Sequence, residues 1–195
     1  MNLDDFASMM ASQLHRAAVP LQRQLDTLKR LNLTVSPAQE EALQADPGPY
    51  EREPYTAILT YLAREGSPQV LAVDSEAAEA GTMYRDLLSR LQALTGGEVV
   101  LADVREEEVT SGSDAVRRVH FALQGRPYAY DAAALGNWLD LDLFAFLNQA
   151  LEAGDFRKRF VTVDDARVQG LLVFYRTPEW ARFFAAGTGL TVKDT

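Results

Sequence analysis

The stretch VRRVHFALQGRPYAY, from Val116 to Tyr130, decides the class of fold. Apolar and polar residues alternate on both sides of Gln124-Gly125, which is typical of strands that bury one face. Glycine tolerates the positive backbone angles that a tight hairpin turn requires. The stretch therefore predicts two adjacent antiparallel strands, Val116–Leu123 and Pro127–Tyr130.

Outside this hairpin, short runs rich in β-branched and aromatic residues predict further strands. They cover Gln69–Val73, Glu98–Val104, Lys158–Val163 and Leu171–Arg176. The run Tyr55–Leu62, after Pro54, fits either a strand or a short helix. Arg105–Asp114 is polar and acidic and contains Ser-Gly-Ser, so we expect a loop there.

Helical periodicity indicates three helices in the same part of the chain. Met83–Leu94 has one apolar face and stops before Gly96-Gly97, and Leu141–Leu151 is strongly apolar. Pro178–Ala186 follows a capping threonine. Strands are adjacent more often than they alternate with helices. We therefore predict an α+β fold, a mainly antiparallel sheet with helices packed on it.

The N-terminal part is predicted to be helical. Its first 31 residues have an amphipathic pattern that Pro20 interrupts, and Ser36 can cap the next helix. A turn over Asp46–Pro49 then separates an N-terminal helical segment, residues 1–49, from a single α+β domain, residues 50–195. Packing on the domain explains the apolar stripe of this segment most simply. Self-association through the N-terminal helices is the alternative.

The composition is that of a globular protein, with 47% hydrophobic and 24% charged residues. There is no cysteine, which excludes a disulfide, a thiolate zinc site and a cysteine nucleophile. Arginine outnumbers lysine 16 to 3, which indicates a GC-rich bacterial source. Met1–Asp5 is acidic where a signal peptide is basic, and no apolar run is long enough for a membrane span. We expect a cytoplasmic protein.

The net charge of −9 disfavours nucleic acids and anionic membranes as partners. Residues 55–115 hold 11 acidic and 4 basic side chains, and so carry most of the excess negative charge. The densest acidic cluster joins Asp103 to Glu106, Glu107 and Glu108. A solvated loop is its simpler interpretation, and a contact for a basic protein partner is its functional one.

Residues suited to catalysis or metal binding are sparse. His15 and His120 are the only histidines, and neither has a partner at a useful spacing. Asp140 with Asp142, and the pair Asp164-Asp165, could hold a divalent cation, but helix starts and turns also favour aspartate. We therefore predict no cofactor and no bound metal.

Four short motifs resemble those of an uncharacterised family of bacterial proteins. They are E-x-x-P-Y at Glu51–Tyr55, Val73–Glu76, Leu94–Gly97 and Asn137–Asp140. The resemblance spans about residues 32–192. It implies one compact α+β unit and supplies no catalytic residues, because the family has no established activity.

Two classes of function remain. The first is a non-enzymatic protein-binding module, an adaptor or an immunity-type inhibitor, which meets a basic partner through the acidic cluster. The second is a small-molecule-binding protein or an enzyme whose pocket combines carboxylates and arginines. Its candidate residues are Asp140, Asp142, Arg157 and Arg176.

Overall fold

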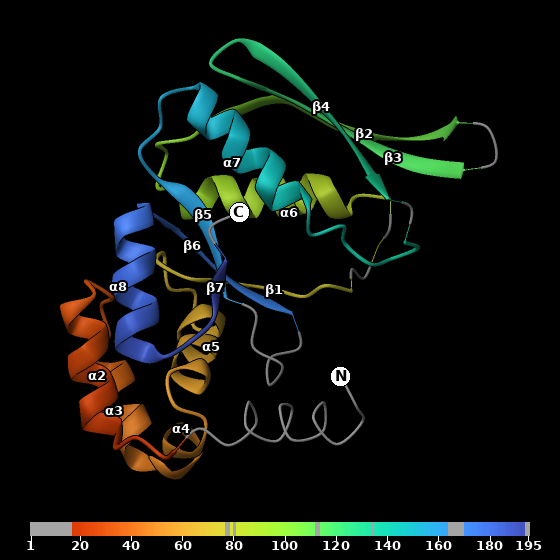
Figure 1. Ribbon diagram of the computed structural model, residues 1–195. Coiled ribbons are helices and arrows are strands. Elements are labelled where there is room, and N and C mark those ends of the chain that lie inside the picture. The colour runs from red at the N-terminus through yellow and green to blue at the C-terminus, as the bar shows by residue number, and fades with distance from the viewer. Residues whose placement is uncertain are drawn as a thin grey trace, which may run out of the picture.

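The computed structural model describes residues 17–193 except 77–78, 80, 112–113, 134 and 164–169, and leaves the side chains of residues 110, 111, 114 and 115 undescribed. Within these ranges the chain forms seven helices and seven strands, and the strands form two antiparallel sheets (Figure 1). The predicted α+β class is therefore confirmed, including the N-terminal helical segment. No helix of the described ranges is long and apolar enough to cross a membrane.

Four helices form the N-terminal part of the described chain. They are α2 (Leu21–Arg30), α3 (Pro37–Ala45), α4 (Gly48–Arg52) and α5 (Thr56–Arg64). Helix α2 begins directly after Pro20, and Ser36 caps α3 as predicted, with Gln39 completing a capping box. The ambiguous run after Pro54 is helical. The predicted first helix extends into residues 1–16, which lie outside the described ranges.

A four-stranded sheet divides the molecule into two cores. Its order is β1 (Leu71–Val73), β6 (Leu171–Arg176), β5 (Arg159–Val163) and β7 (Val192–Lys193). Because successive side chains of a strand point to opposite faces, β6 contributes to both cores. Leu172 and Phe174 pack with α2, α3, α5 and α8 (Pro178–Thr188), whereas Val173 and Tyr175 pack on the other side.

The second core holds α6 (Met83–Leu94) and α7 (Leu143–Ala153) between the two sheets (Figure 1). A three-stranded meander covers these helices: β2 (Leu101–Ser111), β3 (Asp114–Leu123) and β4 (Arg126–Ala133). Gln124 and Gly125 both have positive φ in the turn between β3 and β4, so the predicted hairpin is confirmed.

The predicted loop over Arg105–Asp114 is wrong. Strand β2 continues to Ser111 and β3 starts at Asp114, with Glu107 opposite Arg118 and Glu108 opposite Arg117. Opposite charges face each other across this hairpin. It therefore lacks the apolar alternation that marks a half-buried strand, and its polar sequence resembles that of a loop.

Candidate functional site

Glu106, the centre of the predicted acidic cluster, is directed inward. Its side chain is only 5% exposed, and its Oε2 accepts hydrogen bonds from the backbone N–H groups of Tyr84 (2.9 Å) and Arg85 (3.1 Å). A guanidinium nitrogen of Arg117 lies 3.7 Å from Oε1. Burial raises the pKa of Glu106, and these donors and Arg117 oppose that rise. Glu106 therefore caps α6 and is not available to a partner.

The other three acids of the cluster are exposed but lie apart. Glu107 is on the outer face of the meander, where its carboxylate is 3.0 Å from Nε2 of His120. Glu108 is further along β2, opposite Arg117. Asp103 has a positive φ at the bulge of β2 and lines a separate surface hollow with Val100 and Phe156. The four acids therefore do not form one continuous surface.

Asp140 is a structural junction between three elements. Its Oδ2 accepts hydrogen bonds from the Tyr130 hydroxyl and from the backbone N–H of Ala133, both at 2.9 Å. Its backbone N–H donates to the Tyr84 hydroxyl at 2.9 Å. Burial, followed by the bond to Asp140, raises the pKa of Tyr130. These bonds join β4 and the start of α7 to the first turn of α6.

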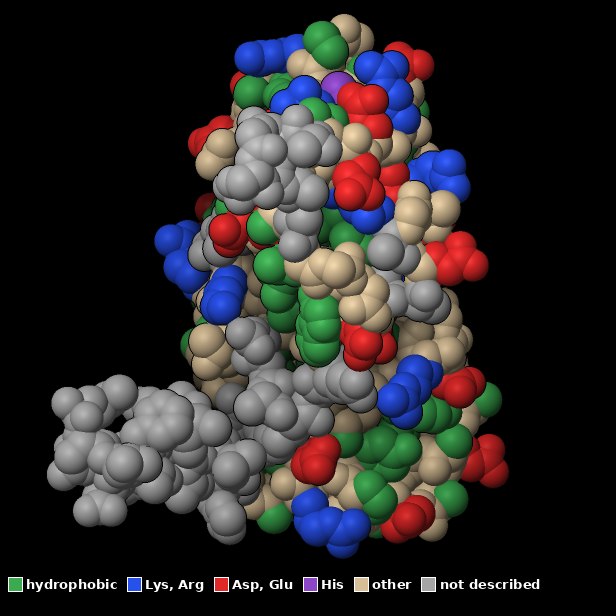
Figure 2. Space-filling view, turned by 90° about the vertical axis from the view of Figure 1, so that its right-hand side faces the viewer, with side chains coloured by type: hydrophobic (Ala, Val, Ile, Leu, Met, Phe, Trp, Pro, Cys, Tyr) green, Lys and Arg blue, Asp and Glu red, His purple; other side chains and the backbone are tan. Residues whose placement is uncertain are grey.

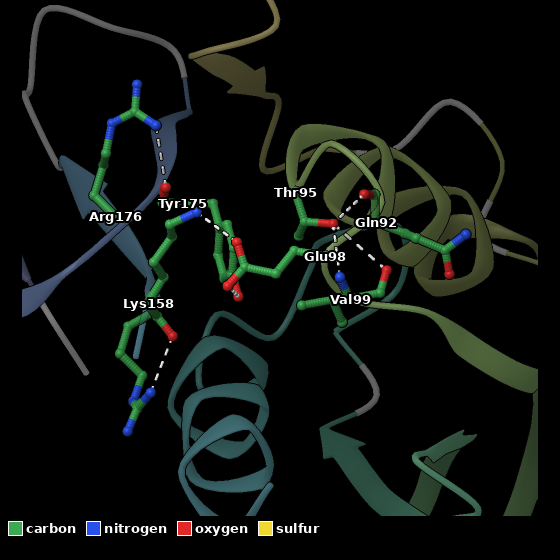
Figure 3. A network of polar contacts seen from close by, with 8 residues as sticks. Gln92, Thr95, Glu98, Val99, Lys158, Tyr175 and Arg176 are labelled. Carbon is green, nitrogen blue, oxygen red and sulfur yellow. Dashed lines mark hydrogen bonds and ion pairs between the residues drawn. The ribbon is translucent and has the colours of Figure 1, made fainter. Parts of the chain in front are cut away.

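The arginines of the predicted carboxylate–arginine pocket lie elsewhere. Figure 3 shows Arg176 next to Tyr175, whose hydroxyl donates to Glu98 at 3.1 Å. Lys158, the neighbour of Arg157, forms an ion pair with the same carboxylate. Glu98 follows the C-terminal end of α6, whereas Asp140 contacts its first turn. A helix of 12 residues is about 18 Å long, so Asp140 and the strand end that carries Arg176 contact opposite ends of α6.

Two segments distant in the sequence do converge beside α6. The Leu139 N–H donates to the Ser75 carbonyl at 2.8 Å, and Trp138 forms an antiparallel bridge with Glu76. The Asn137 side-chain amide donates to the Glu76 carboxylate at 3.0 Å, across 61 residues of sequence. The junction brings together the segments Val73–Glu76 and Asn137–Asp140.

A hollow of about 480 Å³ lies beside this junction, and we call it the α6 hollow. It is lined by Val73, Asp74, Glu76, Glu79, Thr82, Met83, Asp86, Leu87, Arg90 and Leu139. Four of these side chains are carboxylates and one is a guanidinium. All four acids belong to the middle third of the chain, which carries most of its negative charge.

The carboxylates of the α6 hollow are held from different elements. Asp74 follows β1 and accepts a hydrogen bond from the Glu76 N–H at 3.0 Å. Asp86 lies in the first turn of α6 and accepts one from the Thr82 hydroxyl at 2.6 Å. Arg90, one turn further along α6, donates to the Ala72 carbonyl.

The carboxylates of the α6 hollow are dispersed around its wall. No group of three or more His, Cys, Asp or Glu side chains in the described ranges is close enough to hold a metal. Asp164-Asp165, the second predicted cation site, lies outside those ranges. Dispersed carboxylates around a concave surface attract a lysine or arginine side chain without coordinating it.

Comparisons of the chain with protein-family models, with curated proteins and with solved structures give no match. The resemblance to an uncharacterised bacterial family therefore stays a prediction.

Proposed function

We propose that the chain is a non-enzymatic protein-binding module, an adaptor or an immunity-type inhibitor, for a partner with a basic surface. The observation that carries this proposal is the convergence of Asp74, Glu76, Glu79 and Asp86 at the α6 hollow. Like charges gathered around a concave surface strengthen the local potential and speed encounter with an oppositely charged protein.

In this proposal the main contact with the partner moves from the predicted acidic cluster to the acids of the α6 hollow. Asp103, Glu107 and Glu108 are exposed and stay as secondary contacts for a basic partner. Glu106 is left out, since its buried carboxylate already binds two backbone N–H groups. The α6 hollow takes the central role because its acids come from two stretches of chain, residues 74–79 and α6, and share one cavity.

A low-salt pull-down tests the proposal. The full chain is used to recover proteins from a bacterial lysate, in parallel with the double variant Glu79→Gln/Asp86→Asn. We expect the variant to lose the basic proteins that the natural chain recovers. Recovery should also fall with salt, because the Debye length shrinks from ~10 Å at 0.1 M to ~3 Å at 1 M.

The control is matched in charge. Glu41→Gln/Glu152→Gln removes two exposed carboxylates on α3 and α7, outside the residues that line the hollow. A Glu107→Gln/Glu108→Gln variant measures the secondary contacts. If all three variants lose the same amount of recovered protein, recovery depends on net charge alone and not on the hollow. Full retention in all three, at both salt concentrations, would refute the proposal.

The hollow also supports a second candidate, a small organic cation as ligand. Its volume lies within the range of small-molecule sites, and Arg90 beside four carboxylates could bind the carboxylate of an amino-acid-like ligand. Thermal unfolding with added putrescine or arginine tests this. A rise in midpoint that Glu79→Gln/Asp86→Asn abolishes would favour the small ligand.

Two further expectations belong with this proposal. Self-association through the N-terminal helices stays an alternative use of their apolar stripe, and sedimentation equilibrium tests it. A cytoplasmic location, expected from the sequence, is part of the same proposal.

A further inference from the structure

A tryptophan and two leucines are exposed on one short segment between β4 and α7. Trp138 is 50% exposed, Leu135 51% and Leu141 38%. We call these three residues the Trp138 patch. Figure 2, which faces the side of the molecule where this segment lies, shows hydrophobic side chains gathered near its mid-height among charged ones. Exposed apolar groups that cluster in this way mark interaction surfaces more often than isolated ones do.

The backbone that carries the patch is fixed. The Trp138 N–H donates to the Leu135 carbonyl at 3.3 Å, and the next N–H, that of Leu139, donates to Ser75. The Leu139 side chain is buried, as is that of Leu143 at the start of α7. The exposure of Trp138 is therefore built into the fold. A rigid aromatic side chain loses little conformational entropy on binding, which is why tryptophan is common among the dominant contacts of interfaces.

The backbone that carries the patch adjoins the α6 hollow. Glu76 lines the hollow and forms a backbone bridge with Trp138, and Leu139 lines it from the next position. Asp142, exposed, follows Leu141 at the start of α7. An apolar surface bordered by carboxylates is complementary to a segment that carries both apolar and cationic side chains.

We infer that the Trp138 patch and the α6 hollow together bind one exposed segment of a partner protein. The segment places an apolar side chain on Trp138 and a neighbouring lysine or arginine in the hollow. This inference rests on the proposed function, and it adds the chemistry of the partner. A free small cation would use the hollow without the patch, and an anionic membrane would be repelled by the same carboxylates.

The test selects peptides on the full chain. A phage-displayed library of random-sequence peptides is selected on the natural chain alone, and the enriched peptides are then measured against Trp138→Ser. We expect the enriched peptides to carry a lysine or arginine close to an aromatic or aliphatic residue. Their affinity should fall at least about tenfold in Trp138→Ser, as for a dominant interface contact. It should fall by a smaller, salt-dependent factor in Glu79→Gln.

Matched controls separate the patch from general surface effects. Phe183→Ser removes an aromatic side chain that is 70% exposed on α8, and Glu41→Gln removes a distant charge. Both should bind the peptides as the natural chain does. Unfolding midpoints are measured for every variant, and Leu135→Ser replaces Trp138→Ser if the latter does not fold.

Each remaining outcome counts against the inference. Enriched peptides that are neutral or acidic, or that bind Trp138→Ser unchanged, would overturn it and leave the proposed function standing. If no peptide is enriched, the inference is wrong, and if the lysate pull-down is also empty, the proposed function fails with it. If the natural chain dimerises in sedimentation equilibrium and Trp138→Ser is monomeric, the patch binds a second copy and the inference is wrong.

Discussion

The Glu106 carboxylate in β2 accepts a hydrogen bond from the backbone N–H of Tyr84, the second residue of α6, at 2.9 Å. The N-terminus of a helix exposes N–H groups without helical partners and favours a negative charge. Thr82, the residue in the N-cap position, makes no side-chain cap of its own. A strand in the neighbouring layer therefore supplies the cap, and it fixes the helix end that forms one wall of the α6 hollow.

Replacing Glu106 should destabilise the protein more than replacing its neighbours in sequence. Glu106→Ala leaves the N–H groups of Tyr84 and Arg85 without their acceptor and should cost about 1–3 kcal/mol of unfolding free energy. Glu107→Ala removes an exposed pair with His120 and an exposed charge opposite Arg118, and it should cost less than about 1 kcal/mol. Urea denaturation measures both. Equal effects would mean that the cap adds nothing to stability.

The burial of Glu106 also predicts a pH dependence. Its pKa is raised above 4.5 in the folded protein, so the folded state binds this proton more tightly than the unfolded chain does. The destabilisation from the buried charge is present at neutral pH. It is relieved as the pH falls through the raised pKa towards 4.5.

Comparison with Glu106→Gln isolates this effect, because the natural protein and the variant share all other titrating groups. The unfolding free energy of the natural protein, minus that of Glu106→Gln, should rise as the pH is lowered from neutral towards 4.5. Urea titrations at several pH values give this difference. A difference that stays constant or falls would contradict the prediction.

Local sequence signals predicted much of the fold. The bounds of α6 match the predicted Met83–Leu94, because its apolar face and the following glycines are both local features. The β3–β4 hairpin was predicted for the same reason, from Gln124-Gly125 between alternating runs. Ser36 and Thr177 cap their helices as their positions in sequence indicate.

The β2–β3 hairpin and the site depend on contacts that sequence alone does not reveal. Glu106 and Glu107 are adjacent in sequence, yet one caps a helix and the other faces solvent, because strand side chains alternate. The α6 hollow needs Glu76 beside Trp138, two residues from distant motifs. No local pattern in either segment indicates that the two touch.

Gln24 links the N-terminal helices across the predicted domain boundary, so replacing it tests whether residues 1–49 fold independently of residues 50–195. This side chain is buried in α2 and donates to the carbonyls of Val19 and Tyr50 at 2.7 and 2.9 Å. Its oxygen accepts the N–H of Tyr55 at 2.7 Å, where Tyr55 has a positive φ of 66°. The predicted boundary between residues 49 and 50 lies within α4, in the stretch that Gln24 holds.

Gln24→Leu should cost about 1–3 kcal/mol, because it leaves buried backbone groups on both sides of that boundary without partners. Gln22→Leu is the control, since Gln22 is exposed and its side chain donates to Asp26 within the same helix. The unfolding transition of Gln24→Leu should stay single. Two separate transitions would indicate that residues 1–49 fold apart from the domain.

The stability of Leu147→Ala tests whether α7 is central to the core. Its side chain is buried in the core between the two sheets. Leu147→Ala should cost about 2–5 kcal/mol through lost burial and the cavity that remains. Gln149→Ala, at an exposed position of the same helix, should change the unfolding free energy by less than about 0.5 kcal/mol. A loss below about 0.5 kcal/mol for Leu147→Ala would make α7 peripheral.

Gly170 immediately precedes β6 and faces the end of β1. Its φ is +115°, and a Cβ at this position would lie 2.0 Å from the carbonyl oxygen of Val73. A side chain there must displace backbone, and its own backbone angles are unfavourable for any residue but glycine. Val73 also lines the α6 hollow, so the clash would act on one wall of the proposed binding site.

Gly170→Ala should therefore cost about 2–5 kcal/mol, combining backbone strain with overpacking. Gly189→Ala is a matched control, because Gly189 also has a positive φ, +68°, but has no atom within 4 Å of the position a Cβ would take. It should cost only about 1–2 kcal/mol, the strain of a left-handed residue alone. Urea denaturation of the two variants measures the difference. Equal costs would show that β1 and β6 can separate at this point without loss of stability.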